Sequence, residues 1–274
     1  MEKAKKIQKL GLILHPAKPE AAELALHMAQ ACRRAGVEPV EGETADADVI
    51  AVLGGDGTIL RALGMMQGGV RPVLGFNLGH MGFLTECAPQ AAEEAVRRLA
   101  QGEYRLETRM LLRVTCGENA PTLALNDVAV SRGICQSVLN ARVRVDGQPA
   151  AEFAGDGLVI ASPTGSTAYS LSAGGPVVTP NMECIVISPV CPHTFSARPM
   201  VVSGESLVEA EIAPRSGEGA VMVSVDGAPG KMVEYASVRV ERAQERLPFV
   251  RFEEDRFFES LRGKLSLWGG MGNS

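Results

Sequence analysis

An aspartate lies among three glycines directly after a strand-like apolar run. Residues 52–58 read Val-Leu-Gly-Gly-Asp-Gly-Thr, and the apolar run begins at Val49. A glycine-rich turn between a buried strand and a helix is where α/β proteins hold phosphates, because backbone N–H groups can approach the ligand there. A carboxylate at this point would repel phosphate unless it bridges through a metal ion or acts on a neighbouring hydroxyl. Asp56 therefore indicates phosphoryl-transfer chemistry.

This loop matches neither of two common phosphate-binding motifs. It is not a P-loop, because no Gly-Lys-Ser/Thr follows, and it is not a G-x-G-x-x-G fingerprint, because Leu60 replaces the third glycine. The glycines still let backbone N–H groups approach a pyrophosphate, and we expect Thr58 to cap the next helix. A tight turn with a solvated Asp stays open as the alternative. The candidate phosphate-binding residues are Gly54, Gly55, Gly57 and Thr58.

A second segment, residues 154–176, combines glycine with many hydroxyl side chains around a strand-like apolar core at 158–161. Such a segment buries little apolar surface and offers many hydrogen bonds, which suits a ligand with ribose and phosphate groups. Tyr169 could stack on a base, although a lone aromatic side chain more often packs. An Ω-loop stabilised by its own hydroxyl groups remains the alternative.

A third feature is the pair Asn126-Asp127, which interrupts an apolar strand pattern. Adjacent Asn and Asp are unfavourable in a strand. Asn offers a donor and an acceptor to an amide or a base edge, and Asp accepts hydrogen bonds from ribose hydroxyls. An Asx turn explains the pair equally well, so the pair alone is a weak signal of binding.

The glycine loop needs a strand before it and a helix after it, and hydrophobic periodicity predicts both. In the first hundred residues, short apolar runs alternate with stretches of helical spacing, which predicts a parallel sheet covered on both faces. Pro and Gly mark the ends of several helices. We expect strands at residues 10–14, 49–53 and 72–76, and helices at 19–35, 58–67 and 89–101.

After about residue 103 the pattern changes to period two, as at 139–145 and 221–225. Asp146-Gly147 and Asp226-Gly227 fall where hairpin turns are needed, so this region is expected to be antiparallel β. Helical spacing returns from residue 247, where three apolar residues could share a face that packs on the first domain. The domains expected are 1–103 with 244–274 (α/β) and 104–243 (β-rich). The three apolar residues are Phe257, Phe258 and Leu261.

Composition favours a cytoplasmic protein that binds small molecules. The chain has 274 residues, a net charge of −5 and scattered basic residues, which argues against a nucleic-acid partner. No apolar run approaches the ~20 residues of a membrane span, and no signal peptide is expected. Six cysteines without a Cys-x-x-Cys pair indicate reduced thiols, and Cys191 with His193 makes no metal site, so no metal ligands are proposed.

Taken together, these features closely resemble the NAD kinase family over nearly the whole chain. The Gly-Gly-Asp-Gly motif alone is shared with diacylglycerol kinases and phosphofructokinases. Its joint occurrence with the Asn-Asp pair and the long glycine- and hydroxyl-rich segment makes the resemblance specific. The matching stretches are residues 54–58, 77–85, 126–127, 155–157 and 164–175.

This resemblance implies an enzyme that transfers the γ-phosphate of ATP to the 2′-hydroxyl of the adenosine ribose of NAD, giving NADP and ADP. It implies that Asp56 is the proton acceptor for that hydroxyl. It also implies a divalent metal with ATP, either Mg²⁺ or Mn²⁺, and a homodimer or homotetramer. The implied fold is a Rossmann-like α/β domain, completed by the C-terminal helix, with an inserted β-rich NAD-binding domain.

By the same resemblance, Gly57 and Arg61 line the site around the catalytic aspartate. Asn126 and Asp127 look like the family pair that holds one end of the dinucleotide, and Asp156 looks like its second carboxylate. Six consecutive residues resemble the segment that wraps the adenosine. They are Thr167, Ala168, Tyr169, Ser170, Leu171 and Ser172.

Some positions depart from the family pattern. Ala154 stands where many bacterial members have Arg, so one charged contact is absent or supplied from elsewhere, and Ala228 stands where some have Gln. Two rival functions remain. A related lipid or sugar kinase would explain residues 54–58 but not the other motifs. A dinucleotide sensor without activity would fit the missing arginine but gains nothing from a carboxylate near phosphate.

Overall fold

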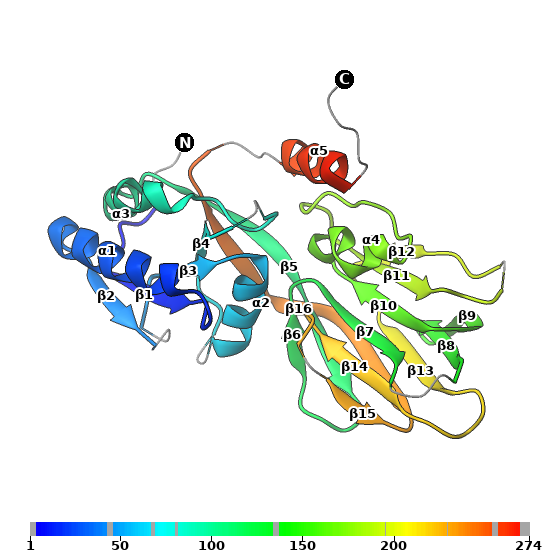
Figure 1. Cartoon of the computed structure of the whole chain (residues 1–274). Helices are drawn as coiled ribbons and strands as arrows, with labels where there is room; N and C mark the ends of the chain where they lie inside the picture. The colour runs from blue at the N-terminus through cyan, green and yellow to red at the C-terminus, as the bar shows by residue number, and fades with distance from the viewer. Residues whose placement is uncertain are drawn as a thin grey trace. The chain divides into compact units, whose positions relative to one another are not determined.

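The computed structural model describes residues 4–42, 46–66, 69–79, 82–133, 137–194, 196–228, 230–253 and 257–268 (Figure 1). The chain divides into two compact units, residues 1–108 with 247–274 and residues 109–246. Strands β5 (Arg105–Cys116) and β16 (Ala236–Arg251) each contribute residues to both units. The boundaries between the units therefore fall within these two strands. They lie a few residues beyond residues 103 and 243, where the domain boundaries were expected from the sequence.

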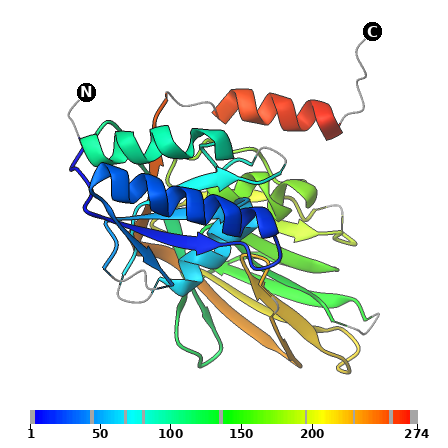
Figure 2. The same cartoon turned by 60° about the vertical axis from the view of Figure 1, so that its left-hand side comes forward.

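The first unit is built on a parallel sheet in the order β2-β1-β3-β4, and the end of β16 pairs in parallel with β4 at Phe249 and Val73. Every residue of β3 is buried, as expected for a central parallel strand. Helices α1 and α3 lie side by side (Figure 2) and share a hydrophobic core with this sheet. The strands are β1 (Lys9–Leu14), β2 (Glu38–Glu41), β3 (Val49–Gly54) and β4 (Val73–Asn77).

Most helix predictions for this unit are confirmed. Helix α1 (Pro19–Ala35) has Pro in its first turn and ends at Gly36, whose φ of 71° is left-handed. A short 3₁₀ turn, η1 (Pro89–Ala91), leads into α3 (Ala92–Gln101), which ends at Gly102 in the same way. Strand β2 was not predicted, because its four residues include a proline and two glutamates.

Helix α2 (Asp56–Met65) begins two residues earlier than expected. The carbonyl of Gly55 accepts the N–H groups of Thr58 at 2.9 Å and Ile59 at 3.2 Å, so Gly55 is the N-cap. Thr58 is therefore the third helical residue rather than the N-cap, and the predicted cap is right only in part, because the Thr58 hydroxyl accepts the Gly55 N–H at 3.4 Å. Asp56 is the first helical residue rather than a loop residue.

The C-terminal segment from residue 247 begins as a strand and continues as a helix. Residues 247–251 belong to β16, so the helical spacing predicted from 247 is wrong there, and the helix α5 (Phe257–Trp268) begins later. Phe257 is buried, whereas Phe258 is 63% exposed. Adjacent helical residues point about 100° apart, so the two rings do not share a face. Of the two rings, the buried Phe257 packs against Phe83 of the same unit.

The second unit is antiparallel β, as predicted. One sheet has the order β12-β11-β10-β7-β14-β15, and strands β16, β13, β8 and β9 follow one another in the other sheet, where β5 pairs with β16 and β6. Alternating residues of the strands form a core of the unit. The strands are β6 (Thr122–Ala124), β7 (Asp127–Arg132), β8 (Leu139–Val145), β9 (Gln148–Gly155), β10 (Gly157–Ala161), β11 (Cys184–Val190), β12 (Met200–Ser203), β13 (Val208–Pro214), β14 (Val221–Val225) and β15 (Lys231–Val233).

Both predicted hairpin turns are confirmed. Asp146-Gly147 joins β8 to β9 and Asp226-Gly227 follows β14, and all four residues have positive φ, from 50° to 77°. Left-handed backbone at both central positions is the type I′ geometry that Asp-Gly favours. Among the described residues, five of the cysteines are free, and no helix is both long and apolar enough to cross a membrane.

Candidate functional site

The Asp56 carboxylate is held by backbone donors from a neighbouring segment. Its Oδ2 accepts the N–H of Phe83 at 2.8 Å, and its Oδ1 accepts the N–H of Leu84 at 3.1 Å. Gly82 permits this approach, because a Cβ at Gly82 would lie 1.9 Å from Oδ1. The carboxylate is therefore fixed in direction rather than free in solvent, and the alternative of a solvated Asp in a tight turn fails.

A lysine completes the surroundings of this carboxylate. Lys264, on α5, places its Nζ 3.7 Å from Oδ2 of Asp56 and 4.0 Å from the centre of the Phe83 ring. Both charged side chains are about three-quarters buried, with exposed fractions of 24% for Lys264 and 28% for Asp56. The sequence pattern of the tail predicts only packing, and Lys264 was not among the predicted site residues.

The glycines of the loop differ in what surrounds them. Open space lies where a side chain would stand on Gly55 or Gly57, whereas a Cβ on Gly54 would lie 2.1 Å from Oγ1 of Thr58. Thr58 is buried, and its hydroxyl lies 3.4 Å from the Gly55 N–H. Arg61 is exposed and donates to the Leu14 carbonyl at 2.6 Å. The loop thus has one open side at Gly55 and Gly57 and one side packed on Thr58.

In the second unit, the Asn126-Asp127 pair is held by another carboxylate. Asp226 accepts three consecutive N–H groups, from Leu125 at 2.8 Å, Asn126 at 2.7 Å and Asp127 at 3.1 Å. The hairpin turn accounts for Asp226 in the sequence, so this role was not predicted. The pair is not a local Asx turn, because the side chain that holds it comes from about a hundred residues away.

The glycine- and hydroxyl-rich segment packs directly on this pair. The Asn126 carbonyl accepts the Ser162 N–H at 2.8 Å, and a Cβ on Gly165 would lie 2.1 Å from the same oxygen. The segment folds as β10, a 3₁₀ turn η2 (Thr164–Thr167) and a short helix α4 (Tyr169–Ser172). The structure therefore brings two of the three predicted motifs together within one unit.

Several hydroxyl groups of this segment bond to protein atoms. Ser166 donates to the Pro163 carbonyl at 2.7 Å, Thr167 donates to the Thr164 carbonyl at 3.2 Å, and Ser170 lies 2.9 Å from the Ser188 hydroxyl. The alternative of a segment stabilised by its own hydroxyls is thus partly right. Four other predicted residues are at least partly accessible, and two of them, Tyr169 (42%) and Ser172, are exposed. They are Ala168, Tyr169, Leu171 and Ser172.

Asp156 is paired with a cation that the sequence analysis did not identify. Arg132, on β7, donates from its guanidinium to Oδ2 of Asp156 at 2.9 Å. The backbones also meet, because the Arg132 N–H donates to the Asp156 carbonyl at 3.1 Å. Ala154 has no charge, and Arg132 places a guanidinium beside Asp156 from the adjacent strand.

Burial shifts the acidity of the two carboxyls beside the pair. Burial first, and the nearby Asp226 charge second, raise the pKa of Asp127 to about 7. Burial also raises the pKa of Asp226, against the three N–H groups that lower it. Asp127 therefore changes its charge near neutral pH.

This shift predicts how stability depends on pH. The folded-state pKa of Asp127 lies above its unfolded value near 4, so the folded chain holds an extra proton between about pH 4 and 7. The resulting stabilisation is complete below about pH 4, falls as the pH rises from about 4 to 7 and is lost above about 7. Asp127→Asn replaces this carboxyl with an amide, which does not titrate in this pH range. From pH 5 to 8 we expect the melting temperature of the natural protein to fall by about 2 °C or more relative to this variant. Parallel melting curves for the two proteins would contradict the shift.

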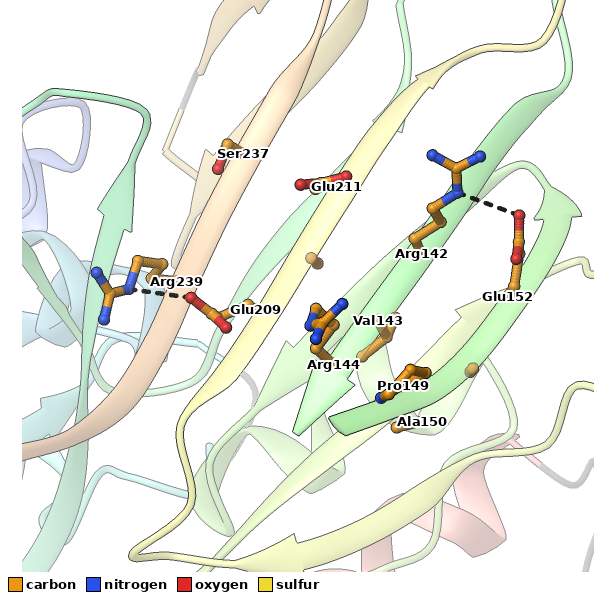
Figure 3. Close-up of a pocket in the computed structure, with 12 residues that line it drawn as sticks. Arg142, Val143, Arg144, Pro149, Ala150, Glu152, Glu209, Glu211, Ser237 and Arg239 are labelled. Atoms are coloured by element: carbon orange, nitrogen blue, oxygen red, sulfur yellow. Dashed lines mark hydrogen bonds and ion pairs between the residues drawn. The ribbon is translucent and has the colours of Figure 1, made fainter. Parts of the chain in front are cut away.

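A surface pocket lies elsewhere on the second unit (Figure 3). Its volume is ≈ 500 Å³, and it lies on the solvent side of β8, β9, β13 and β16. Its charges are mixed, with Arg142 paired to Glu152 at 3.2 Å and Arg239 to Glu209 at 3.6 Å. None of the predicted site residues lines it, so it is separate from the candidate site.

Comparison with known proteins gives consistent results. The model of the ATP-NAD kinase N-terminal domain matches residues 38–104, and that of the C-terminal domain matches residues 125–252. The chain is 37% identical to the NAD kinase of Moorella thermoacetica, over 96% of this chain and 91% of that protein. It is 40% identical to the NAD kinase of Symbiobacterium thermophilum, over 93% of this chain and 92% of that protein.

Two solved structures are also similar. The NAD kinase from Archaeoglobus fulgidus in complex with ATP matches with a TM-score of 0.76 and 30% identity, over 94% of this chain and 98% of that chain. The yeast NADH kinase complexed with NADH matches with a TM-score of 0.86 and 24% identity, over 98% of this chain and 89% of that chain. The second match supports the fold alone.

Proposed function

This chain belongs to the NAD kinase family, and from that premise we propose that Asp56 receives the proton of the hydroxyl that is phosphorylated. The protein is a phosphotransferase that converts NAD and ATP to NADP and ADP, with the adenosine ribose 2′-hydroxyl as acceptor. The observation that carries the proposal is the fixed direction of the Asp56 carboxylate, bonded to Phe83 and Leu84 at the start of α2.

Phosphoryl transfer has a loose transition state, so most catalysis comes from positioning and from neutralising charge. A ribose hydroxyl is a weak acid. A hydrogen bond from this hydroxyl to Asp56 would aim its oxygen at the phosphate and accept its proton late in the step. A carboxylate held by two backbone N–H groups is suited to this, because it needs no rearrangement when the substrate arrives.

We propose that the loop residues bind the phosphates of ATP. Gly55 and Gly57 have open space beside them, so a phosphate can approach their backbone. The start of α2 adds the partial positive charge of a helix N-terminus. Thr58 packs on Gly54 and would support the loop on the side away from the open space at Gly55 and Gly57. Arg61 is exposed on α2, where it donates to the Leu14 carbonyl, and its guanidinium would be available to the substrates.

The divalent metal that the family resemblance implies would be bound mainly by the phosphates of ATP, with a carboxylate of this chain beside it. Mg²⁺ usually keeps several waters and is bound by one or two carboxylates plus substrate phosphates. Asp56 is the carboxylate at the phosphate loop and would be the residue that meets Mg²⁺ or Mn²⁺ there. When bound, such an ion would supply positive charge at the transferred phosphate. Asp56 holds its orientation through Phe83 and Leu84 in either case.

We propose that NAD binds to the second unit through the Asn126-Asp127 pair, Asp156 and the adjoining segment. Tyr169 is exposed enough to stack on a base, and Ser172 is exposed enough to donate a hydrogen bond. Ser170 is fully buried and bonds to Ser188, so its role would be to support the segment rather than to touch the ligand.

One assay separates this function from its two rivals. Purified protein is incubated with ATP, Mg²⁺ and NAD, and NADP is measured with an NADP-specific dehydrogenase. We expect NADP in proportion to the ATP consumed. A lipid or sugar kinase would leave NAD unchanged while phosphorylating its own acceptor, and a sensor would bind NAD without consuming ATP.

Arg132 supplies a testable detail of NAD binding. Arg132→Gln removes the guanidinium that orients Asp156, so we expect the KM for NAD to rise about tenfold, with a smaller change in the KM for ATP. Arg142→Gln is the matched control, because Arg142 is a surface arginine of the same unit with 70% of its side chain exposed. Equal effects of the two substitutions on the KM for NAD would contradict the role of Arg132.

A homodimer or homotetramer located in the cytoplasm stays a prediction of the family resemblance. Analytical ultracentrifugation of the purified protein would determine the oligomeric state.

A further inference from the structure

The C-terminal helix α5 places a cation against the catalytic aspartate. The Lys264 ammonium lies 3.7 Å from Oδ2 of Asp56, the same oxygen that accepts the Phe83 N–H. It also lies 4.0 Å from the centre of the Phe83 ring, within range of a cation–π interaction. One oxygen of the catalytic carboxylate is therefore shared between a backbone donor and a lysine.

The anchoring of α5 supports this position of the lysine. Phe257, the first residue of α5, is buried and packs against Phe83 with ring centres 6.4 Å apart. Lys264 follows Phe257 by seven residues, which is two helical turns, so both side chains emerge on the same face. Phe83 thus contacts α5 at two points, through its ring with Phe257 and with Lys264.

The arrangement poses a problem for a proton acceptor. Asp56 must offer a free lone pair to the ribose hydroxyl, and each of its oxygens has two. Oδ1 accepts the Leu84 N–H and lies close against Gly82, and Oδ2 faces both the Phe83 N–H and the Lys264 ammonium. The backbone N–H of Phe83 is fixed by the chain, whereas a lysine ammonium sits on a flexible four-carbon stem. Lys264 is therefore the donor that can leave.

On the premise that the protein is a kinase acting through Asp56, we propose that Lys264 binds the γ-phosphate of ATP. Before ATP binds, Asp56 holds the Lys264 side chain in place. The γ-phosphate carries more negative charge than a carboxylate and attracts the ammonium more strongly. When Lys264 moves to the phosphate, Oδ2 becomes free to accept the hydroxyl of NAD. The lysine then links ATP binding to release of the proton acceptor.

A comparison of two nucleotides tests this role without NAD and without turnover. The affinities of a non-hydrolysable ATP analogue and of ADP, both with Mg²⁺, are measured by calorimetry for the natural protein, Lys264→Met and Lys264→Arg. We expect Lys264→Met to weaken binding of the analogue about tenfold and to change ADP binding less than twofold. Lys264→Arg keeps a cation and should restore most of the affinity for the analogue.

Arg262→Gln is the matched control, because it removes one positive charge from an exposed position of the same helix. It should leave both affinities within twofold of the natural protein. Equal weakening of both nucleotides by Lys264→Met would mean that α5 only supports the fold. Unchanged binding of both nucleotides would mean that Lys264 at most orients Asp56. Either result overturns the proposal.

The two levels of inference fail in different ways. If the natural protein makes no NADP from ATP and NAD, the proposed function is wrong. If it makes NADP while Lys264→Met still discriminates the ATP analogue from ADP as the natural protein does, only the role of Lys264 is wrong.

Discussion

Asp56→Asn is expected to lower kcat for NADP formation by about 10²- to 10⁴-fold while the protein stays folded. The amide keeps the size of the carboxylate but cannot accept the proton of the ribose hydroxyl, and general-base contributions are typically of this magnitude. The carboxylate also accepts N–H groups from Phe83 and Leu84, so some loss of stability is expected too. Steady-state kinetics with NAD and ATP, alongside a thermal melt, would separate the two effects.

Asp48→Asn is a close control for that experiment. Asp48 lies in the same unit, accepts backbone N–H groups from Gln8 at 2.7 Å and Lys9 at 3.0 Å, and has Lys5 Nζ at 3.9 Å. Its surroundings thus resemble those of Asp56 without the glycine loop. We expect Asp48→Asn to lower the melting temperature without a comparable loss of kcat. An unchanged kcat in folded Asp56→Asn would refute the role of proton acceptor, and recovery at high Mg²⁺ would favour metal ordering instead.

Local sequence rules predicted much of the fold. The ends of α1 were predictable because Pro19 and Gly36 are strong helix boundary signals. The hairpin at Asp146-Gly147 was predictable for a similar reason, since both residues tolerate positive φ. The start of α2 was placed two residues late, because Gly55 acts as an N-cap through its backbone alone and leaves no side-chain signal.

The parts of the site that were missed are long-range contacts. Asp226 reaches back to the N–H of Leu125 from 101 residues away, and Lys264 reaches Asp56 from the far end of the chain. No local spacing encodes such contacts. For Asp226, the only local signal was an aspartate before a glycine, and the predicted hairpin turn already accounted for it. Asp56 was selected from its glycine-rich loop alone, and its catalytic role stays a prediction.

Gly82→Ala is expected to reduce kcat by about 10²-fold or more, although residue 82 bears no reactive group. The new Cβ would lie 1.9 Å from Oδ1 and 2.6 Å from Cγ of Asp56, so the carboxylate must move. A displacement of about 1 Å at a reacting group can cost about 10²-fold in rate. Gly79→Ala is the control, since the nearest atom to its Cβ would be Lys18 Nζ, the end of a flexible side chain, at 3.4 Å.

The double variant Gly82→Ala with Asp56→Asn tests whether the glycine acts through the aspartate. If Gly82→Ala only displaces the carboxylate, it should add little once Asp56→Asn has removed the proton acceptor, because residues that act as a unit are not additive. If the two losses in kcat instead multiply, Gly82→Ala must disturb another part of the site, and the fixed direction of Asp56 would not be what Gly82 provides. If Gly82→Ala alone has the same kcat as the natural protein, the carboxylate tolerates displacement. That result would contradict the proposed need for its fixed geometry.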